Sequence, residues 1–376
     1  MVMIDPALQS ELTDRIAQRI AQDRRLLDTL RAEIAPLKDQ VHRIQPRTVT
    51  SIAFVGTDGG NNQLWFDPFL VQIVRVVDSS NNSYAVDVIT PESDTRELSQ
   101  RHMDDAGSEL GKLMRLLEVE SLWKLSPMIP APGSANRSPS WVQVYRELTE
   151  WATMLHLLRD RTYGTDTIIV FDGLLRSKVF SGMLFQKLRS EFDGAIKSHE
   201  KEKRRIHLAG IAKHSKVLDR YQLVMALEGV LTTKYPAYLE VPRAIEAKAY
   251  VWPEYARGDE NNDGGEANKF VGGKMFLVKF GPGAHDPVWP VDIFEPQVRD
   301  APVVIGSLLA DAINGFPVPY YPRCLQKAHE NAALVDFDYD VMQDEIYKGI
   351  RRALGAEAPA LDAFLLRTAD VAARRY

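Results

Sequence analysis

The feature that most constrains this chain is the order in which its strand-like and helix-like segments follow one another. Residues 51–55 are a short apolar run, and strand-like stretches follow at 69–77 and 84–89. The intervening segment 78–82, Asp-Ser-Ser-Asn-Asn, is typical of a turn, so the last two stretches should be antiparallel neighbours. Together the three stretches predict an antiparallel meander.

An alternation of helices and strands follows the meander. A helix is predicted over 141–159, because its apolar residues share one stripe: Val144, Leu148, Trp151, Leu155 and Leu158. The next segments are an apolar strand at 167–171, a helix at about 178–199, a strand at 206–211 and a helix at 218–231. This is the element order of the ribonuclease H fold. We therefore predict an α/β fold with a ribonuclease H-like mixed sheet flanked by helices and an N-terminal helical extension.

The rest of the chain is assigned more simply. We divide it into an N-terminal helical arm (1–48), a main domain (49–340, with loop excursions near 123–140 and 253–273) and a C-terminal helical tail (341–376). The further elements expected are helical segments at 94–122, 302–314, 323–334 and 342–354, and strands at 244–251, 274–280 and 288–293. An acidic, Asn/Gly-rich loop is expected at 259–265.

The N-terminal segment 6–45 is predicted to be one long helix or a helical hairpin. Its apolar residues alternate at spacings of three and four, as in a coiled coil: Leu27, Leu30, Ile34, Leu37, Val41 and Ile44. Pro36 interrupts this pattern. The helix packs either on its own domain or on a partner, and we favour the partner arm.

Composition excludes several classes of protein. No window holds eighteen uncharged apolar residues, which argues against a membrane span. The N-terminus lacks the basic start and apolar block of a secretory signal, so we expect a cytoplasmic protein. The single cysteine, Cys324, excludes an internal disulfide framework and a cysteine-based zinc site.

The net charge of −5 is not that of a typical nucleic-acid binder. Binding to DNA would therefore depend on a local basic surface, on metal ions or on a partner protein. One basic cluster runs from the end of the helix at 178–199 to the start of the strand at 206–211: Lys197, Lys201, Lys203, Arg204 and Arg205. It is equally well interpreted as a DNA contact or as a solvated helix end.

Two aspartates follow strands that the predicted fold makes neighbours. Asp58 closes the first strand and Asp172 closes the fourth, and a glycine follows each. Both carboxylates should emerge at the same end of the sheet, and a shared cation would offset their repulsion. Oxygen ligands of this kind suit Mg²⁺ or Mn²⁺ rather than zinc.

Four further residues are candidates for the same site. The helix before Asp172 offers Glu147, which lies nearer its apolar stripe, and Glu150, which the fold's usual helix-to-strand spacing favours. His329 is a candidate fourth ligand, and Lys213 could neutralise a phosphate oxygen. Cleavage of a phosphodiester builds negative charge on the attacking and leaving oxygens, and two metal ions about 4 Å apart stabilise both.

Four short strings, in order, resemble the motifs of NurA nucleases. They are the strand ending in Gly56-Thr57-Asp58-Gly59-Gly60, the strand ending in Asp172-Gly173-Leu174-Leu175, the segment Lys213-His214-Ser215, and Tyr321-Pro322 with Ala328-His329. The resemblance spans about residues 50–340. Gly60 and Leu174 stand where the family has serine.

The resemblance implies a Mn²⁺-dependent nuclease that resects DNA ends, often 5′ to 3′, with single-strand endonuclease activity as a second possibility. It also implies a homodimer docked on a HerA-type hexameric translocase, acting in DNA repair or phage defence. By carry-over, Asp58, a helix glutamate, Asp172 and His329 hold metal, with Lys213 nearby.

Two alternatives come from other classes of protein. The serine departures allow a degenerate nuclease that serves as an adaptor for its translocase. An ATPase of the actin and sugar-kinase type shares the core strand order, but the second half shows no convincing adenosine-binding Gly-Gly segment. Gly272-Gly273 is expected in a long polar loop.

Overall fold

A nine-stranded mixed sheet organises the part of the chain that the computed structural model describes, which is residues 6–47, 53–66, 69–134, 138–250, 270–333 and 336–359. Its strand order is β1-β7-β8-β9-β6-β5-β2-β3-β4. The strands are β1 (His42–Arg43), β2 (Ala53–Phe66), β3 (Phe69–Asp78), β4 (Ser83–Ile89), β5 (Thr167–Asp172), β6 (Ile206–Ile211), β7 (Ala237–Glu240), β8 (Gly273–Lys279) and β9 (Val288–Phe294).

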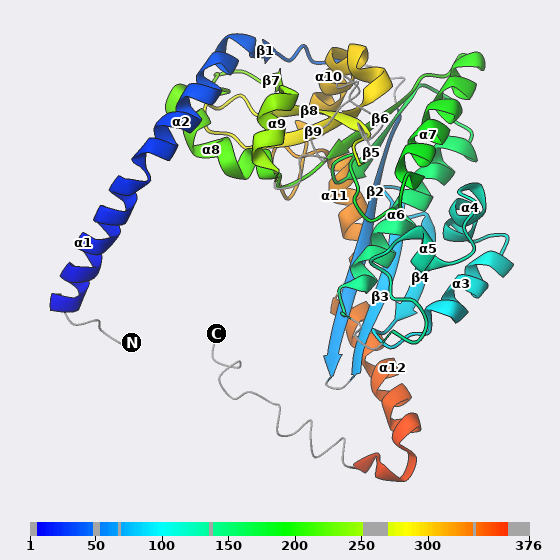
Figure 1. The fold of residues 1–376 in the computed structure, drawn as a ribbon. Helices are drawn as coiled ribbons and strands as arrows, with labels where there is room; N and C mark the ends of the chain where they lie inside the picture. The colour runs from blue at the N-terminus through cyan, green and yellow to red at the C-terminus, as the bar shows by residue number, and fades with distance from the viewer. Residues whose placement is uncertain are drawn as a thin grey trace.

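Helices surround this sheet (Figure 1). They are α1 (Pro6–Gln22), α2 (Arg24–Ile34), α3 (Thr95–Asp104), α4 (Glu109–Leu116), α5 (Leu122–Leu125), α6 (Trp141–Arg159), α7 (Leu184–Lys201), α8 (Lys216–Glu228), α9 (Arg243–Ala249), α10 (Ala301–Ala312), α11 (Arg323–Ala332) and α12 (Asp336–Leu354). None of the helices in the described residues is long and apolar enough to cross a membrane.

The first five strands of the main domain confirm the ribonuclease H-like order. β2, β3 and β4 form the antiparallel meander, β5 pairs in parallel with β2, and β6 pairs in parallel with β5. The resulting spatial order is β4-β3-β2-β5-β6. Beyond β6 the sheet continues with antiparallel strands β9, β8 and β7.

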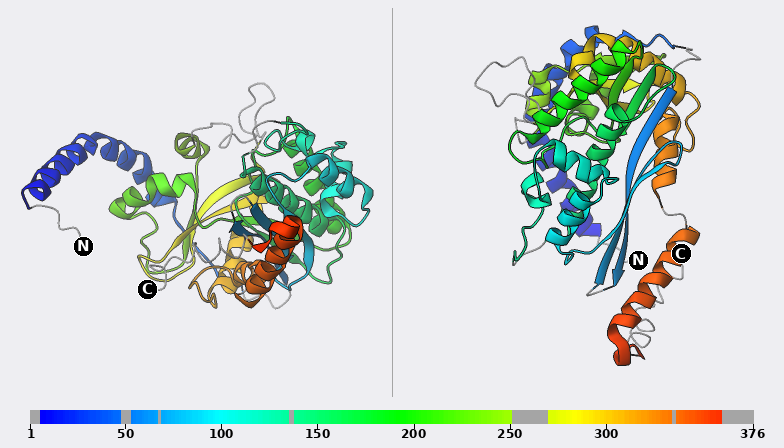
Figure 2. Two further views of the ribbon diagram at one scale, coloured as in Figure 1. Left: turned by 90° about the horizontal axis from the view of Figure 1, so that it is seen from below. Right: turned by 90° about the vertical axis from the view of Figure 1, so that its right-hand side faces the viewer.

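Alternate residues of the central strands face two different apolar cores. Ile169 of β5 and Leu208 of β6 join a core with the aromatic residues of α6, α7 and the α3–α5 region. Ile168 and Ala209, one position away, join a core with α10 and α11 on the other face. The sheet is therefore a middle layer between two helical layers, as the views of Figure 2 show.

Two predictions of strand extent are wrong. The strand expected at 244–251 is helix α9, because Ala, Glu and Lys are strong helix formers and Pro242 precedes the first helical residue. The strand of this region is β7 instead. Asp58 does not close its strand either, since β2 continues in antiparallel pairing with β3 to Phe66.

The N-terminal segment forms two consecutive helices. Ile34 and Leu37, from the coiled-coil-like series, are buried in a third core with α8, β7 and β8, and Leu27 and Leu30 pack against it. This part of the series packs on its own chain, so the spacing does not require the partner arm that we favoured. α1 extends away from the sheet in both figures. The acidic loop expected at 259–265 lies outside the described residues.

Candidate metal site

Strand pairing brings Asp58 and Asp172 together. β2 and β5 pair in parallel as far as Thr57 opposite Phe171, so the next residue of each strand is one of the two aspartates. The carboxylate oxygens of Asp58 and Asp172 and a ring nitrogen of His329 all lie within 4.8 Å of one another. Asp58 Oδ2 and His329 Nδ1 are 2.7 Å apart. Residues separated by more than a hundred positions thus form one cluster.

Two glycines of β2 allow α11 to place His329 over Asp58. A Cβ atom on Gly56 would lie 2.5 Å from the carbonyl oxygen of Cys324, and one on Gly60 would lie 2.4 Å from that of Ala332. A side chain at either position would push the helix away from the strand. Gly60, one of the departures from the NurA motif, therefore fits this chain's own packing.

Both carboxylate oxygens of Asp172 have partners. Tyr321 donates a hydrogen bond to Oδ1 at 3.2 Å, and the Lys213 ammonium lies 3.3 Å from Oδ2. The Tyr321 ring is buried and packs against Trp289, with ring centroids 4.7 Å apart. Burial, and next the neighbouring charge of Asp58, raises the pKa of Asp172. Tyr321 and Lys213 hold the orientation of this carboxylate.

The two glutamates of α6 have different surroundings. Glu147 accepts hydrogen bonds from Ser177 Oγ at 2.5 Å and from Trp151 Nε1 at 3.4 Å, which tie it to the segment after β5. Burial raises the pKa of Glu147. Its carboxylate is therefore directed towards structural partners.

Glu150 is the glutamate that is electrostatically coupled to both aspartates. Burial raises its pKa to about 8; the Arg146 guanidinium opposes this shift, and the charges of Asp58, Glu147 and Asp172 add to it. A Cβ atom on Gly59 would lie 2.0 Å from Glu150 Oε1, so the carboxylate rests directly on β2. Glu150 lies outside the three-residue cluster but beside it.

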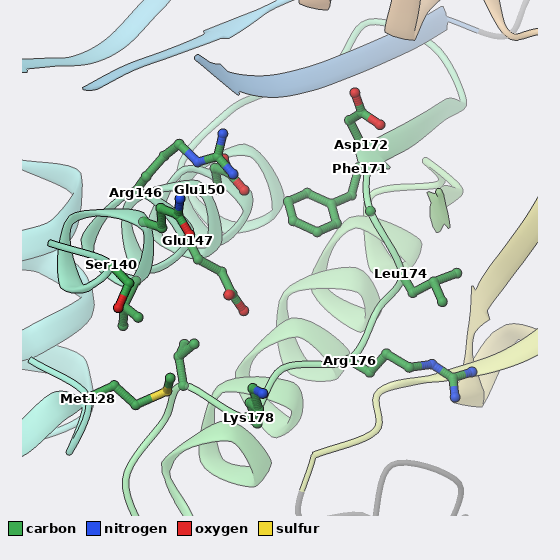
Figure 3. Close-up of a pocket in the computed structure, with 14 residues that line it drawn as sticks. Met128, Ser140, Arg146, Glu147, Glu150, Phe171, Asp172, Leu174, Arg176 and Lys178 are labelled. Carbon is green, nitrogen blue, oxygen red and sulfur yellow. The ribbon is translucent and has the colours of Figure 1, made fainter. Parts of the chain in front are cut away.

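A pocket of about 420 Å³ opens next to these carboxylates. Figure 3 shows Arg146 and Glu150 on α6 across from Phe171 and Asp172, with Lys178 farther along the wall. Polar residues share the lining with apolar Met128, Val144 and Val179. A pocket that combines an apolar wall with a few converging charged groups is typical of a small-ligand or substrate site.

Two residues of this site were missed in the sequence. Arg146 stands four residues before Glu150, a spacing at which helix side chains meet, so the pattern could have identified it. Tyr321 appeared only as part of a motif, and nothing in the sequence indicated its contact with Asp172. The structure thus adds two supporting side chains to the six residues predicted.

The basic cluster before β6 lies at the other end of the sheet from this site. It precedes Ile206, which pairs with Thr167 at the start of β5, whereas Asp172 pairs with Ile211 at the end of both strands. Lys197 pairs with Asp193, and Arg205 pairs with Asp166. These contacts favour the solvated helix end over a contact with DNA at the site.

A second group with potential metal ligands is an ion-pair network. Glu109, His156 and Asp160 have ligand atoms within 4.8 Å of one another. The Lys112 ammonium lies 3.0 Å from Glu109 and 3.9 Å from Asp160, so a cation already neutralises these carboxylates. The hydrogen bond to Glu109 raises the pKa of His156.

The donor set of the main cluster fits a divalent cation. Two carboxylates and an imidazole are oxygen and nitrogen donors, which Mn²⁺ accepts and Mg²⁺ accepts in part. The close contact of two acidic side chains, each largely shielded from water, also favours a bound cation. Fold and site together define a ribonuclease H-like α/β protein with a carboxylate-histidine cluster beside a pocket.

Comparisons with known proteins add a structural likeness. No protein-family model matches the chain, and no curated protein matches it. The chain is similar to the crystal structure of the NurA nuclease from Sulfolobus solfataricus, with 14% identity, a TM-score of 0.46, and coverage of 94% of this chain and 99% of that one. It is also similar to a crystal structure of NurA with manganese (12% identity, TM-score 0.38, coverage 92% and 98%). A third similar structure is NurA bound to dAMP and manganese (11% identity, TM-score 0.37, coverage 87% and 94%).

Proposed function

We propose that this protein is a metal-dependent nuclease that hydrolyses phosphodiester bonds of DNA. The observation that carries the proposal is the convergence of Asp58, Asp172 and His329, with Glu150 beside them; Asp172 and Glu150 also line a pocket. In this proposal Asp58, Asp172 and His329 hold a divalent cation. Glu150 holds a second cation together with the aspartates.

The remaining side chains of the site would bind the substrate or orient the metal ligands. Bound Mn²⁺ or Mg²⁺ supplies charge stabilisation at the phosphate and lowers the pKa of the attacking water. Lys213, 3.3 Å from Asp172, is placed to neutralise a non-bridging phosphate oxygen. Tyr321 fixes the rotation of the Asp172 carboxylate. The pocket receives a nucleotide against its apolar wall of Met128 and Val179.

The proposed substrate is DNA ends, degraded in the 5′ to 3′ direction. The net charge of −5 supports a partner that delivers the DNA, because a surface of this charge repels phosphates on its own. We propose a HerA-type hexameric translocase for that role, with the nuclease as a homodimer. Repair of DNA and defence against phage are the processes that use such a pair.

The described residues of the second half, 270–333 and 336–359 among them, give no observation that favours the ATPase alternative. Gly273, one of the two glycines weighed for adenosine binding, begins strand β8 and does not lie in a long polar loop. A Cβ atom on Gly273 would lie 2.8 Å from Asp292 Cβ, so close packing inside the protein accounts for this glycine. The activity test described next distinguishes a nuclease from an adaptor that has lost its activity.

The test is degradation of linear DNA by the purified full chain with Mn²⁺. Asp58→Asn and Asp172→Asn are each expected to lower the rate at least about 100-fold, since even residues that only support metal ligands are worth 10- to 100-fold. Asp104→Asn, on the exposed surface of α3, is the matched control and should keep the wild-type rate. Substrates labelled at the 5′ or the 3′ end report the direction.

Equal Mn²⁺-dependent rates for wild type and both aspartate variants would exclude this site. If the wild-type protein cleaved no DNA substrate, either alone or with the translocase, the result would favour the alternative that the protein is an adaptor without nuclease activity.

A further inference from the structure

Arg146 connects two parts of the candidate site. It stands on α6 one turn before Glu150, and its Nε lies 3.3 Å from Glu150 Oε1. Its Nη1 donates a hydrogen bond of 2.8 Å to the carbonyl oxygen of Gly59. Gly59 directly follows Asp58 in β2. One guanidinium therefore ties the glutamate of the helix to the strand that carries an aspartate.

Arg146 and Glu150 are in close contact without a hydrogen bond between them. The Nε–H of Arg146 is buried and has no aligned acceptor, although the oxygen is 3.3 Å away. No hydrogen bond from a described residue is accepted by the Glu150 carboxyl group. The guanidinium thus restrains this group by close contact and leaves its lone pairs available to a cation.

Gly59 completes the arrangement from the other side. A Cβ atom there would lie 2.0 Å from Glu150 Oε1 and 2.7 Å from its carboxyl carbon. The carboxylate is therefore confined between the backbone of β2 and the guanidinium. This confinement keeps Glu150 next to Asp58 before any cation arrives.

We propose that Arg146 is a positioning residue that holds Glu150 in place for the divalent cation by bridging it to the Gly59 carbonyl. The inference rests on the proposed function, because it assumes that the carboxylates hold metal. Both contacts of the bridge are needed. Lysine offers one compact ammonium in place of a planar fork, so it cannot reproduce both contacts.

The experiment measures Mn²⁺ binding by calorimetry on the full chain, without DNA. Arg146→Gln is expected to weaken Mn²⁺ binding about 10- to 100-fold, the range for a partner of a metal ligand. Arg146→Lys should recover only part of the loss. Arg159→Gln, an exposed arginine on the same helix that lines a different pocket, is the control and should bind Mn²⁺ like wild type.

A double-mutant cycle separates positioning from a general loss of structure. In a Glu150→Gln background, Arg146→Gln should have no further effect on Mn²⁺ affinity, whereas structural damage would add to the first loss. Gly59→Ala keeps the guanidinium and displaces the carboxylate, and it should also weaken binding. It gives a second route if Arg146→Gln does not fold.

Different outcomes overturn different claims. Wild-type protein that binds no Mn²⁺ would refute the proposed metal site itself. Wild-type binding that Arg146→Gln leaves unchanged or tightens would refute the positioning role alone. Full recovery in Arg146→Lys would show that charge is sufficient and would refute the bridge to Gly59.

Discussion

The carboxyl group of Glu150 links metal binding to pH. Its pKa in the metal-free protein is raised to about 8, mainly by burial, so most molecules hold this proton at pH 7. A cation displaces that proton when it binds. We therefore expect Glu150 to release a proton when Mn²⁺ binds at pH 7. The Mn²⁺ association constant should therefore rise by up to about tenfold for each pH unit below pH 8. Above pH 8 it should become independent of pH.

The assay is calorimetric titration of Mn²⁺ between pH 7 and 9, in buffers with different heats of ionisation. Glu150→Gln removes the titrating group and keeps the shape of the side chain, so the difference between the two proteins isolates Glu150 from other ligands. A wild-type affinity that follows the same pH dependence as Glu150→Gln would refute the reasoning.

The same pKa shift predicts the sign of a stability effect. The folded protein keeps the Glu150 proton up to about pH 8, whereas an unfolded glutamate loses it above about pH 4.3. The metal-free fold therefore loses stability as pH rises between these values. With metal removed by EDTA, Glu150→Gln should raise the free energy of unfolding at pH 8, and less so at pH 5. Equal effects at both pH values would contradict the shift.

Two further predictions concern the frame around the site. Arg176→Met leaves the fully buried Asp292 without the guanidinium that binds both of its oxygens, and should cost about 3–5 kcal/mol in urea unfolding; an unchanged midpoint would contradict this. Gly56→Ala places a Cβ 2.5 Å from the Cys324 carbonyl oxygen and so displaces α11 with His329. We expect about 1–3 kcal/mol of lost stability and weaker Mn²⁺ binding, and wild-type affinity would show that α11 is not held by this contact.

Elements with strong periodicity could be predicted from the sequence. The helix expected at 141–159 is α6 with the same bounds, and the strand expected at 206–211 is β6. Their apolar patterns are long or uninterrupted, so burial determines them locally. The segment that forms α9 was predicted as a strand. Its helical propensity and the pairing of Glu246 with Arg176 favour the helix.

The choice between the two glutamates of α6 required the tertiary structure. They lie three residues apart on one helix, so a helical wheel places both near the sheet. Ser177, in the segment after β5, donates a hydrogen bond to the Glu147 carboxylate. Gly59 and Arg146 confine Glu150 beside Asp58. The spacing along the helix could indicate Arg146, but Ser177 and Gly59 come from other segments and are not indicated by it.

The sequence by itself determined the order of the elements and placed Asp58 and Asp172 shortly after two apolar runs. Because β2 and β5 pair in parallel as far as Thr57 and Phe171, the next residue of each strand is one of these aspartates, and the two emerge side by side. Only the tertiary structure decided how far β2 runs, which glutamate approaches the aspartates, and how α11 brings His329 onto Asp58. These outcomes depend on contacts between segments that are far apart in the chain. Local patterns of polarity do not determine which distant segments come into contact.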